Sequence, residues 1–375
     1  MPPCPPRGRG GAACAFGAAR CKGRPFMGGI IIIMKKIKIG INGFGRIGRI
    51  LLRIIANRPD MEVVAVNNPK LTLDYAKYQF THDTIFGRWN GTCDIKGEFL
   101  VVNGKKITIF GAEEPKLIPW DKANVDVVVD ATGVFKSHKA LSQHIKGSVK
   151  KVIITAPADA DVPMFVYGVN TDNYQDEMSV ISASSCTTNC LAPLVKVIDD
   201  ALGIEEAFMT TVHSATSSQK VVDGSSKKDY RGGRAASYNI IPSSSGATKA
   251  TGKVVPSLQG KLTGLSFRVP TLDVSVVDVT IKLAKETTYE KIVAIMKKAE
   301  KGDFAGVIKT TDEPAVSSDF IGEPCTCVFD ITAGQMLSPK FVKLIAWYDN
   351  EYGYSTQVVN LISHIMTPPK KSRKK

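Results

Sequence analysis

The sequence predicts an α/β protein in which a parallel-sheet domain is followed by an α+β domain with a mostly antiparallel sheet. In the first half, short apolar strands alternate with segments whose apolar residues follow a helical spacing, which is typical of a parallel sheet. In the second half, long runs alternate apolar and polar residues at 272–281, 326–332 and 341–348, which is typical of antiparallel strands with one covered face. A chain of 375 residues is long enough to give each domain its own core.

The composition is that of an ordinary globular protein, with 43% hydrophobic and 22% charged residues. No apolar run approaches the ~18 residues of a membrane span, so we expect no membrane association. The net charge of +14 is concentrated at the two ends, since residues 1–34 and 370–375 each carry five basic and no acidic side chains. A principal nucleic-acid role for these basic ends is therefore not expected. Eight scattered cysteines favour a reducing compartment over a disulfide framework.

The two ends of the chain lack the periodicity of folded elements. Residues 1–34 are rich in Pro, Gly, Ala and Arg, and we interpret them as a disordered leader or a targeting extension. Translation from Met27 or Met34 is the alternative. The compartment stays open on this evidence, with a plastid favoured if the leader is real and the cytoplasm otherwise. Residues 367–375 form a basic tail.

A glycine-rich turn follows the first strand of the folded region. The apolar alternation at 37–41 predicts a strand, and Gly43, Gly45 and Gly48 then open a helix before a second strand at 62–66. In such a strand–turn–helix unit the glycines allow the turn and let a pyrophosphate approach the helix N-terminus. The sequence therefore predicts a Rossmann-type domain that binds a dinucleotide.

The residue that distinguishes NAD from NADP in such domains is an amide here. An Asp or Glu about twenty residues after the last glycine normally bonds the adenosine ribose hydroxyl. This chain has Asn68 at that place, next to Asn67. An amide can bond the hydroxyl but carries no charge to repel a 2′-phosphate. Asn68 therefore does not exclude NADP. The alternative is that Asn68 is a neutral substitution in a site that still prefers NAD.

Two further strands, predicted at 125–129 and 151–157, extend the parallel sheet. A helix with His138 and His144 is predicted between them. We expect these histidines, like His82, to be solvated surface residues. Their spacing is not that of metal ligands, so no metal site is predicted.

One cysteine stands where a nucleophile is easily activated. Cys186 follows a predicted strand at 178–182 and precedes a helical pattern at 191–198. The N–H groups and dipole of a helix N-terminus stabilise a thiolate and lower the cysteine pKa. His213 ends another predicted strand at 207–212, and a cysteine with a separate histidine is the minimal activated-thiol pair.

Three other segments complete the second half. A polar, glycine-rich stretch at 214–238 has the length of a functional or interface loop. Thr287 and Glu290 form a capping-box pattern that predicts the start of a helix. An amphipathic helix is predicted at roughly 354–366.

These features together closely resemble phosphorylating glyceraldehyde-3-phosphate dehydrogenase, over nearly the whole of 36–366. The resemblance is carried by several specific motifs in the same order, at 42–48, 184–189, 211–213, 267–270 and 347–351. It implies oxidation of glyceraldehyde 3-phosphate through a Cys186 thiohemiacetal and thioester, with His213 as base, hydride transfer to NAD or NADP, and attack by inorganic phosphate.

The resemblance also implies binding residues. The substrate phosphate is expected at Thr216 and Arg268, and the inorganic phosphate at Ser185, Thr187, Ser245 and Gly246. Cofactor contacts are expected from Gly43, Gly45, Arg46, Ile47, Gly48, Asn68, Thr132, Ser225 and Asn350. Ser225 stands where NAD-using members commonly have proline and photosynthetic NADP-using members have serine, so it supports NADP in the same sense as Asn68.

The expected organisation is a dinucleotide-binding domain at 35–185, a catalytic domain at 186–350, and a C-terminal helix at 351–366 that packs back on the first domain. The loop after His213 is implied to line a neighbouring subunit's cofactor pocket in a homotetramer. The same chemistry on erythrose 4-phosphate remains an alternative, because the sequence does not set substrate length finely.

Overall fold

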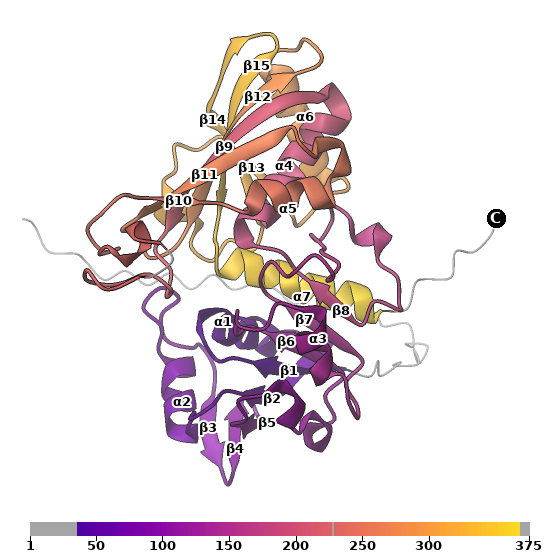
Figure 1. The fold of residues 1–375 in the computed structure, drawn as a ribbon, viewed down its shortest axis with the longest axis vertical. Helices are drawn as coiled ribbons and strands as arrows, with labels where there is room; N and C mark the ends of the chain where they lie inside the picture. Colours follow the sequence, from indigo (N-terminus) through magenta and orange to yellow (C-terminus); the bar gives the residue numbers. More distant parts are fainter. Residues whose placement is uncertain (1–35, 227–228, 368–375) are drawn as a thin grey trace, which may run out of the picture. The chain divides into compact units, whose positions relative to one another are not determined.

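A computed structural model describes residues 36–226 and 229–367 (Figure 1). The predicted leader, and the predicted basic tail beyond Thr367, lie outside the described residues. Two sheets with their covering helices account for most of the rest, one sheet rich in parallel strands and one mostly antiparallel. The predicted fold class is confirmed.

The first sheet, sheet A, has the strand order β3-β4-β5-β2-β1-β6-β7-β8. Pairs from β5 through β2, β1, β6 and β7 to β8 are parallel, whereas β3, β4 and β5 pair antiparallel at one edge. Its strands are β1 (Ile37–Asn42), β2 (Met61–Asn67), β3 (Cys93–Lys96), β4 (Phe99–Val102), β5 (Lys105–Phe110), β6 (Val127–Asp130), β7 (Lys151–Ile154) and β8 (Val180–Ser182). Its helices are α1 (Arg46–Ala56), α2 (Leu73–Thr81) and α3 (His138–Leu141). The β3–β5 edge is absent from the sequence prediction, because its strands are short and joined by tight turns.

The turn between β1 and α1 depends on two of its glycines. Gly43 has a φ of 95°, which side-chain-bearing residues rarely adopt. A Cβ on Gly48 would lie 2.1 Å from the Gly43 carbonyl oxygen, so only glycine allows the helix to pack this closely against the turn. Two glycines thus bring the N-terminus of α1 to the carboxyl end of β1.

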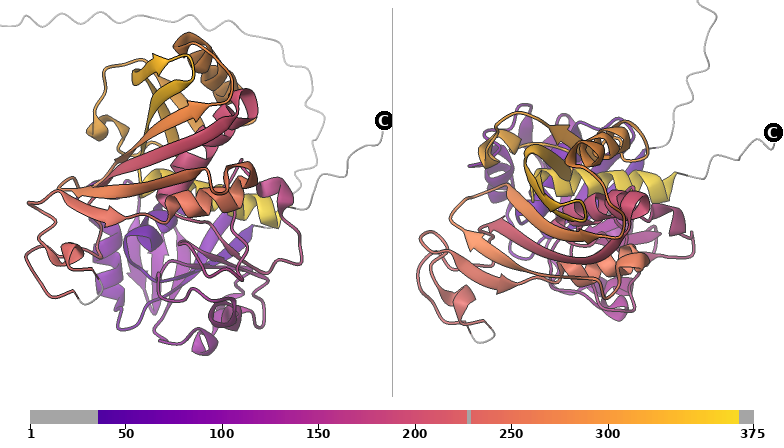
Figure 2. Two further views of the ribbon diagram at one scale, coloured as in Figure 1. Left: turned by 45° about the horizontal axis from the view of Figure 1, so that its top comes forward. Right: turned by 90° about the horizontal axis from the view of Figure 1, so that it is seen from above.

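The second sheet, sheet B, has the order β10-β11-β9-β12-β15-β14-β13. One face is covered by α4, α5 and α6, which share a buried core with it (Figure 2). Its strands are β9 (Ile204–Ser214), β10 (Ile241–Ser244), β11 (Leu262–Val269), β12 (Ser275–Leu283), β13 (Ile308–Thr311), β14 (Cys327–Ser338) and β15 (Phe341–Tyr348). The helices are α4 (Cys186–Leu202), α5 (Ala247–Val254) and α6 (Tyr289–Lys301). The cap of α6 is Thr288, whose hydroxyl accepts from the Lys291 N–H, one residue later than the predicted Thr287.

The last helix, α7 (Tyr352–Met366), joins the core of sheet A. Its buried residues include Val358, Val359 and Ile362, which share one apolar cluster with α1. Figure 1 shows α7 running beside α1. The Gln357 amide also donates to the carbonyls of Gly306 and Pro324, before β13 and β14. Residues near the C-terminus therefore complete a core that begins near residue 37.

The prediction that His144 lies at the surface is wrong. His144 and Asp130 are fully buried, and the His144 Nε2 lies 3.3 Å from an Asp130 carboxylate oxygen. Trp120 donates its indole N–H to the other ring nitrogen at 3.1 Å. Asn42 in turn donates to Asp130 at 2.8 Å. A polar side chain is stable in a core once its hydrogen bonds are satisfied. The sequence around His144 gave no sign of its burial, because its partners Trp120 and Asp130 lie elsewhere in the chain.

None of the helices in the described part of the chain is long and apolar enough to cross a membrane. Across 36–226 and 229–367, no three His, Cys, Asp or Glu side chains gather in a way that could hold a metal ion.

Candidate active site

Cys186 is the first residue of α4, and a strained turn places it there. Ser184 has a φ of 61°, which is uncommon for a residue with a side chain. The Tyr354 hydroxyl donates to the Ser184 carbonyl at 2.9 Å and holds this turn from α7. Ser185 then caps the helix by accepting the Thr188 N–H at 3.1 Å. The thiol therefore stands at the helix N-terminus, as the sequence predicts.

His213 reaches the thiol from β9. Its Nε2 lies 3.5 Å from the Cys186 sulfur, and its Nδ1 lies 2.8 Å from the Ser214 carbonyl oxygen. Because a carbonyl can only accept, we assign the ring proton to Nδ1. Nε2 then presents its lone pair to the thiol. This arrangement suits a base that takes the thiol proton.

Arg268 lies on β11 directly opposite His213 in the strand register. Its guanidinium donates to the Ser214 carbonyl at 3.2 Å and approaches His213 Nδ1 at 2.7 Å. Only the first contact is a hydrogen bond when Nδ1 carries the proton. A fixed cation thus stands beside the thiol and the imidazole.

The electrostatics of the pair differ from the sequence expectation. Burial raises the pKa of the Cys186 thiol, while the charge of Arg268 and the Thr187 N–H group act in the opposite direction. Burial, followed by the charge of Arg268, lowers the pKa of His213 to about 3. The resting pair is therefore a neutral thiol beside a neutral imidazole, because desolvation outweighs the helix N-terminus.

Asn350 is held in one orientation at the same cleft. Its side-chain oxygen accepts hydrogen bonds from the hydroxyls of Ser214 and Ser275, both at 2.8 Å. Both serines are buried. The amide nitrogen is thereby left to face the cleft, as a donor of fixed direction.

Tyr348 fixes the first turn of the helix that carries Cys186, a function that the sequence did not predict. Its buried hydroxyl lies 2.9 Å from the hydroxyls of Thr187 and Thr211. These bonds tie the first turn of α4 to β9 and β15. The alternating pattern at 341–348 showed a buried face but gave no signal for the polar end of this residue.

The side chain of Arg46 is used in ion pairs, which leaves its backbone for the pyrophosphate contact that we expect from this residue. Its guanidinium forms ion pairs with Asp83 and Glu351, so its side chain joins α1 to the segment that carries Asn350. Only its backbone stays at the helix start. α1 has no side-chain cap, and its N-cap residue is Gly45.

The cleft around the thiol has a volume of about 250 Å³. It brings together most of the predicted catalytic and substrate residues. Its walls are formed by Arg46, Ile47, Thr155, Ala156, Pro157, Ser185, Cys186, His213, Thr216, Ser217, Arg268, Asn350, Glu351 and Tyr354. Thr155, Ala156, Pro157, Ser217, Glu351 and Tyr354 were not predicted as site residues, since their signal lies in tertiary contacts.

Several predicted residues lie outside these walls. Thr187 is buried and bonded to Tyr348. Ser245 and Gly246 form the turn into α5, where the Ser245 hydroxyl accepts the Ala247 N–H at 3.2 Å. Ser225 is exposed on the segment between β9 and β10, which extends away from the sheets (Figure 2).

The remaining cofactor residues surround the glycine-rich turn. Asn68 accepts the Phe44 N–H at 3.1 Å and donates to the Pro69 carbonyl at 3.2 Å. Thr132, after β6, donates its hydroxyl to Asp130 at 2.6 Å. A Cβ on Gly45 would meet nothing within 4 Å, so the space in front of the α1 N-terminus is open.

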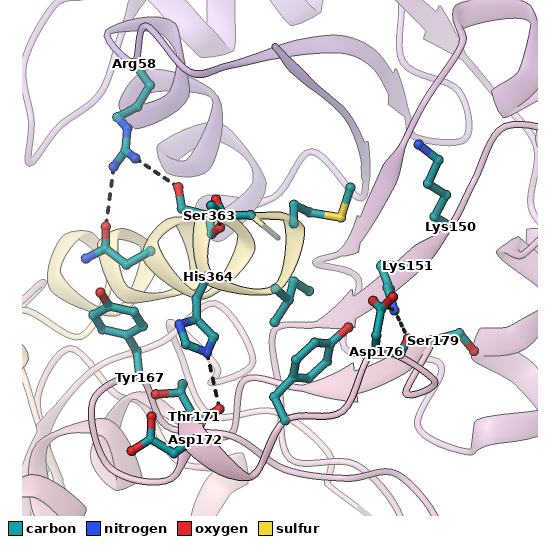
Figure 3. A pocket seen from close by; sticks show the side chains of 15 residues that line it. Arg58, Lys150, Lys151, Tyr167, Thr171, Asp172, Asp176, Ser179, Ser363 and His364 are labelled. Carbon is teal, nitrogen blue, oxygen red and sulfur yellow. Dashed lines mark hydrogen bonds and ion pairs between the residues drawn. The ribbon is translucent and has the colours of Figure 1, made fainter. Parts of the chain in front are cut away.

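A larger hollow of about 1270 Å³ lies at the C-terminal end of α7 (Figure 3). Its lysine and arginine side chains, Arg58, Lys150 and Lys151, are already paired with carboxylates. Arg58 donates to Asn360 and Ser363, and Lys151 pairs with Asp176 at 2.9 Å. No predicted catalytic residue lines it, so we place the chemistry in the smaller cleft.

Two buried carboxyl groups lie next to each other behind Asn350. Asp349 accepts N–H bonds from Gly322, Glu351 and Tyr352, whereas the Asp273 oxygens have no donor among the described residues. Two carboxyl groups can bond each other only through a proton. Burial, together with the charges of Asp349 and Glu351, raises the pKa of Asp273 to about 8.

Asp273→Asn is expected to stabilise the protein in neutral and alkaline solution. The pKa of Asp273 is about 4 in the unfolded chain and about 8 in the folded protein. The protonated carboxyl therefore contributes its full stabilisation below about pH 4, and this contribution is lost as the pH rises towards 8. The asparagine avoids that loss, so we expect a free energy of unfolding higher by about 1–3 kcal/mol at pH 8. Urea unfolding at pH 4 and pH 8 measures it. The exposed Asp312→Asn is the control, and an equal gain at both pH values would contradict the prediction.

Fold and site together define a class of protein. A glycine-rich turn presents an open helix N-terminus at the carboxyl end of a parallel sheet, and a cysteine beside a histidine stands in the adjoining cleft. These are the features of dinucleotide-dependent oxidoreductases that work through a cysteine.

The comparisons with known proteins specify this class further. Two family models match, described as the NAD binding domain of glyceraldehyde 3-phosphate dehydrogenase over 37–138 and its C-terminal domain over 185–350. The chain is 56% identical to glyceraldehyde-3-phosphate dehydrogenase 3 of Saccharomyces cerevisiae over 329 residues, 88% of this chain and 99% of that protein. It is 58% identical to glyceraldehyde-3-phosphate dehydrogenase of Ogataea parapolymorpha over 327 residues, 87% of this chain and 97% of that protein. The chain belongs to the glyceraldehyde 3-phosphate dehydrogenase family.

Proposed function

We propose that this chain catalyses the phosphorylating oxidation of D-glyceraldehyde 3-phosphate to 1,3-bisphosphoglycerate, and the reverse reaction. The observation that carries the proposal is the Cys186 sulfur 3.5 Å from His213 Nε2, in a cleft that Arg268 also lines. The similar proteins named above are glyceraldehyde-3-phosphate dehydrogenases. The comparisons lend no support to erythrose 4-phosphate.

The chain's own residues perform the chemistry at sulfur. As Cys186 attacks the aldehyde carbon, its proton passes to His213 Nε2, and the Ser214 carbonyl keeps the ring in place. The backbone N–H groups at the start of α4 face the oxygen of the thiohemiacetal. The glycine-rich turn and Asn350 would hold NAD or NADP, which would supply the hydride acceptor. Inorganic phosphate then attacks the thioester on Cys186, which releases the acyl phosphate and frees the thiol.

Two phosphate groups need cationic and hydroxyl partners. We assign the substrate phosphate to Arg268 and Thr216, since both line the cleft and a guanidinium binds phosphate oxygens in pairs. We assign the inorganic phosphate to Ser185, Thr187, Ser245 and Gly246. Ser185 lies in the cleft wall. Thr187 is committed to Tyr348, so its contribution is through its backbone N–H and the position of the first turn.

The test of this function is phosphate dependence. With glyceraldehyde 3-phosphate and NAD, the purified protein is expected to turn over only when phosphate is present. Without phosphate, reduced nucleotide should form in an amount equal to the active sites and then stop, because the thioester accumulates on Cys186. Continuous turnover without phosphate would overturn the proposal.

For the dinucleotide, we propose the open N-terminus of α1 as the pyrophosphate site. Gly43, Gly45 and Gly48 shape the turn, and the backbone of Arg46 and Ile47 supplies N–H donors. Asn350 would bond the nicotinamide amide with its fixed donor. Asn68 and Thr132 lie at the adenosine side of the same turn, and Ser225 would come from a neighbouring subunit.

Asn68→Asp is expected to reduce the use of NADP. The carboxylate would repel a 2′-phosphate, so kcat/KM with NADP should fall by about tenfold or more, while kcat/KM with NAD changes by less than about threefold. Steady-state kinetics with both nucleotides measures it. Asn57→Asp, at the opposite end of α1, is the matched control. A wild-type preference for NAD above about a hundredfold would remove the case for NADP.

We further propose that the chain assembles as a homotetramer, with 35–185 and 186–350 as its two domains and 351–366 as the returning helix. The segment between β9 and β10 exposes large apolar side chains, with Tyr230 at 85% and Tyr238 at 89%. The uncovered face of sheet B exposes Phe208 and Leu265. Such surfaces are typical of interfaces, and sedimentation would give the mass of the assembly.

A further inference from the structure

Three adjacent strands of sheet A end in polar side chains. Asn67, Asn42 and Asp130 are the last residues of β2, β1 and β6, and the strand register pairs Asn42 with each of the other two. Figure 1 shows these strands side by side. All three side chains are buried. Burying a polar group costs free energy unless its hydrogen bonds are replaced, so this polar row needs partners.

The polar row is joined by its own hydrogen bonds. The Asn67 amide donates to the Asn42 side-chain oxygen at 2.8 Å, and the Asn42 amide donates to Asp130 at 2.8 Å. Beyond the end of β5, the Asn67 oxygen accepts the Ala112 N–H at 2.9 Å. At the other end of the row, His144 Nε2 lies 3.3 Å from Asp130. The row therefore connects the carboxyl ends of neighbouring strands to a histidine outside the sheet.

Trp120 determines which ring nitrogen of His144 carries the proton. An indole N–H only donates, so His144 Nδ1 accepts from Trp120 at 3.1 Å and the proton lies on Nε2. Nε2 then donates to Asp130. Trp120 and His144 are both fully buried, so water does not compete for either bond. His144 thus offers the row a donor of fixed direction.

Asp130 uses both of its oxygens fully. One oxygen accepts from Asn42 and His144. The other accepts the Thr132 N–H at 3.1 Å and the Thr132 hydroxyl at 2.6 Å. The same hydroxyl accepts the Val134 N–H at 3.2 Å. The orientation of this one carboxylate therefore fixes the segment that follows β6.

This segment packs against the glycine-rich turn. A Cβ on Gly43 would lie 3.0 Å from the Thr132 backbone nitrogen. The Gly43 N–H donates to the Asn67 carbonyl, and the Ala131 N–H to the Asn42 carbonyl, both at 2.8 Å. Because β1 lies between β2 and β6, the strand order reverses here, and ligands of such sheets bind outside the strand ends at this point. A shift of the polar row would therefore displace the turn and Thr132 together.

We propose that His144 is a positioning residue for the dinucleotide. Through Asp130 it holds Thr132 and the glycine-rich turn in the geometry that receives the adenosine side of NAD or NADP, without touching the nucleotide itself. Binding sites depend in this way on hydrogen bonds behind the residues that make contact. The inference rests on the proposed dinucleotide site, but on neither the aldehyde nor the chemistry at sulfur.

His144→Leu tests the inference in the full-length protein. The Kd for NAD, measured by calorimetry, is expected to rise by about tenfold, because Asp130 loses a donor and Thr132 its fixed position. The KM for NAD should rise by the same factor, whereas kcat at saturating NAD and the KM for the aldehyde should stay within about twofold. A purely structural loss would not produce this division. His144→Gln keeps an N–H donor for Asp130 and an acceptor for Trp120, so it should restore most of the affinity.

Two further variants identify the route and provide the control. In a Thr132→Val background, His144→Leu should raise the Kd by less than about threefold, since the hydroxyl that it positions is already absent. His364→Leu is the matched control. It breaks a ring contact of the same length, 3.3 Å, to the Thr171 carbonyl and should leave the Kd unchanged. If His144→Leu does not fold, Asp130→Asn repeats the test, because an amide cannot accept all the donors that the carboxylate accepts.

Equal NAD affinity in the wild type and His144→Leu would overturn the inference, as would a His144→Gln variant no better than His144→Leu. A fall of kcat at saturating NAD as large as the loss of affinity would also contradict it. A wild type that binds no NAD would contradict the dinucleotide site itself, and the inference with it. A wild type that binds NAD but does not oxidise the aldehyde would contradict only the proposed reaction, since the calorimetry still decides the function of His144.

Discussion

Cys186→Ser is expected to lower kcat for phosphate-dependent aldehyde oxidation by roughly a thousandfold or more. A serine hydroxyl is a far weaker nucleophile at neutral pH, and His213 with a pKa of about 3 is too weak a base to ionise it. An oxygen ester formed in its place would also resist attack by phosphate. Single-turnover formation of reduced nucleotide measures the first half of the reaction directly.

The dinucleotide site should be unaffected by this change. Binding of NAD, measured by calorimetry, is expected to stay within about twofold of the wild type, because the dinucleotide contacts proposed above come from the glycine-rich turn, Asn68 and Asn350 and none comes from the Cys186 side chain. Cys93→Ser, on β3, is the control for loss of a thiol elsewhere. If Cys186→Ser kept a rate near that of the wild type, the nucleophile would have to be another group.

His213→Asn is expected to lower kcat by about 10²- to 10⁴-fold. Asparagine can still approach the thiol, but it cannot accept a proton, so the neutral Cys186 has no base when it attacks. The thioester half-reaction should slow most, while the phosphate half-reaction, in which no thiol proton is removed, should slow less. Pre-steady-state measurements of the two halves distinguish them.

A second readout separates the base from a structural effect. Alkylation of Cys186 by iodoacetamide should slow in His213→Asn in step with kcat, since both need the thiol proton to leave. The exposed His138→Asn should change neither rate. Loss of kcat with unchanged alkylation would place the function of His213 later in the reaction than sulfur attack.

Local patterns in the sequence predicted the elements that position the site. The alternation at 37–41 and the spacing of Gly43, Gly45 and Gly48 predict β1, the turn and α1, because strand period and glycine conformation are local properties. Cys186 at a helix start and His213 near a strand end were predicted in the same way. Their separation of 3.5 Å was not, since it depends on how α4 packs on β9.

The features that could not be predicted from the sequence are those that depend on burial in the folded protein. Tyr348 reads as one more apolar position, yet its hydroxyl joins Thr187 and Thr211. His144 reads as a surface residue, yet Trp120 and Asp130 satisfy both of its ring nitrogens. The helix N-terminus suggested a thiolate, but desolvation in a narrow cleft reverses the direction of the Cys186 pKa. Each depends on partners far away in the chain.

The packing of α7 against α1 has a consequence for the order in which the newly made chain gains its structure. Arg58 bonds Ser363, 305 positions later, so the nucleotide-binding half lacks part of its own interior until synthesis is nearly finished. At about 5–20 residues per second, the ribosome needs roughly 15–60 seconds to deliver that missing piece. During this interval the apolar side of α1 is open to chaperones, and the first half of the enzyme becomes protease-resistant only after the last turn has emerged.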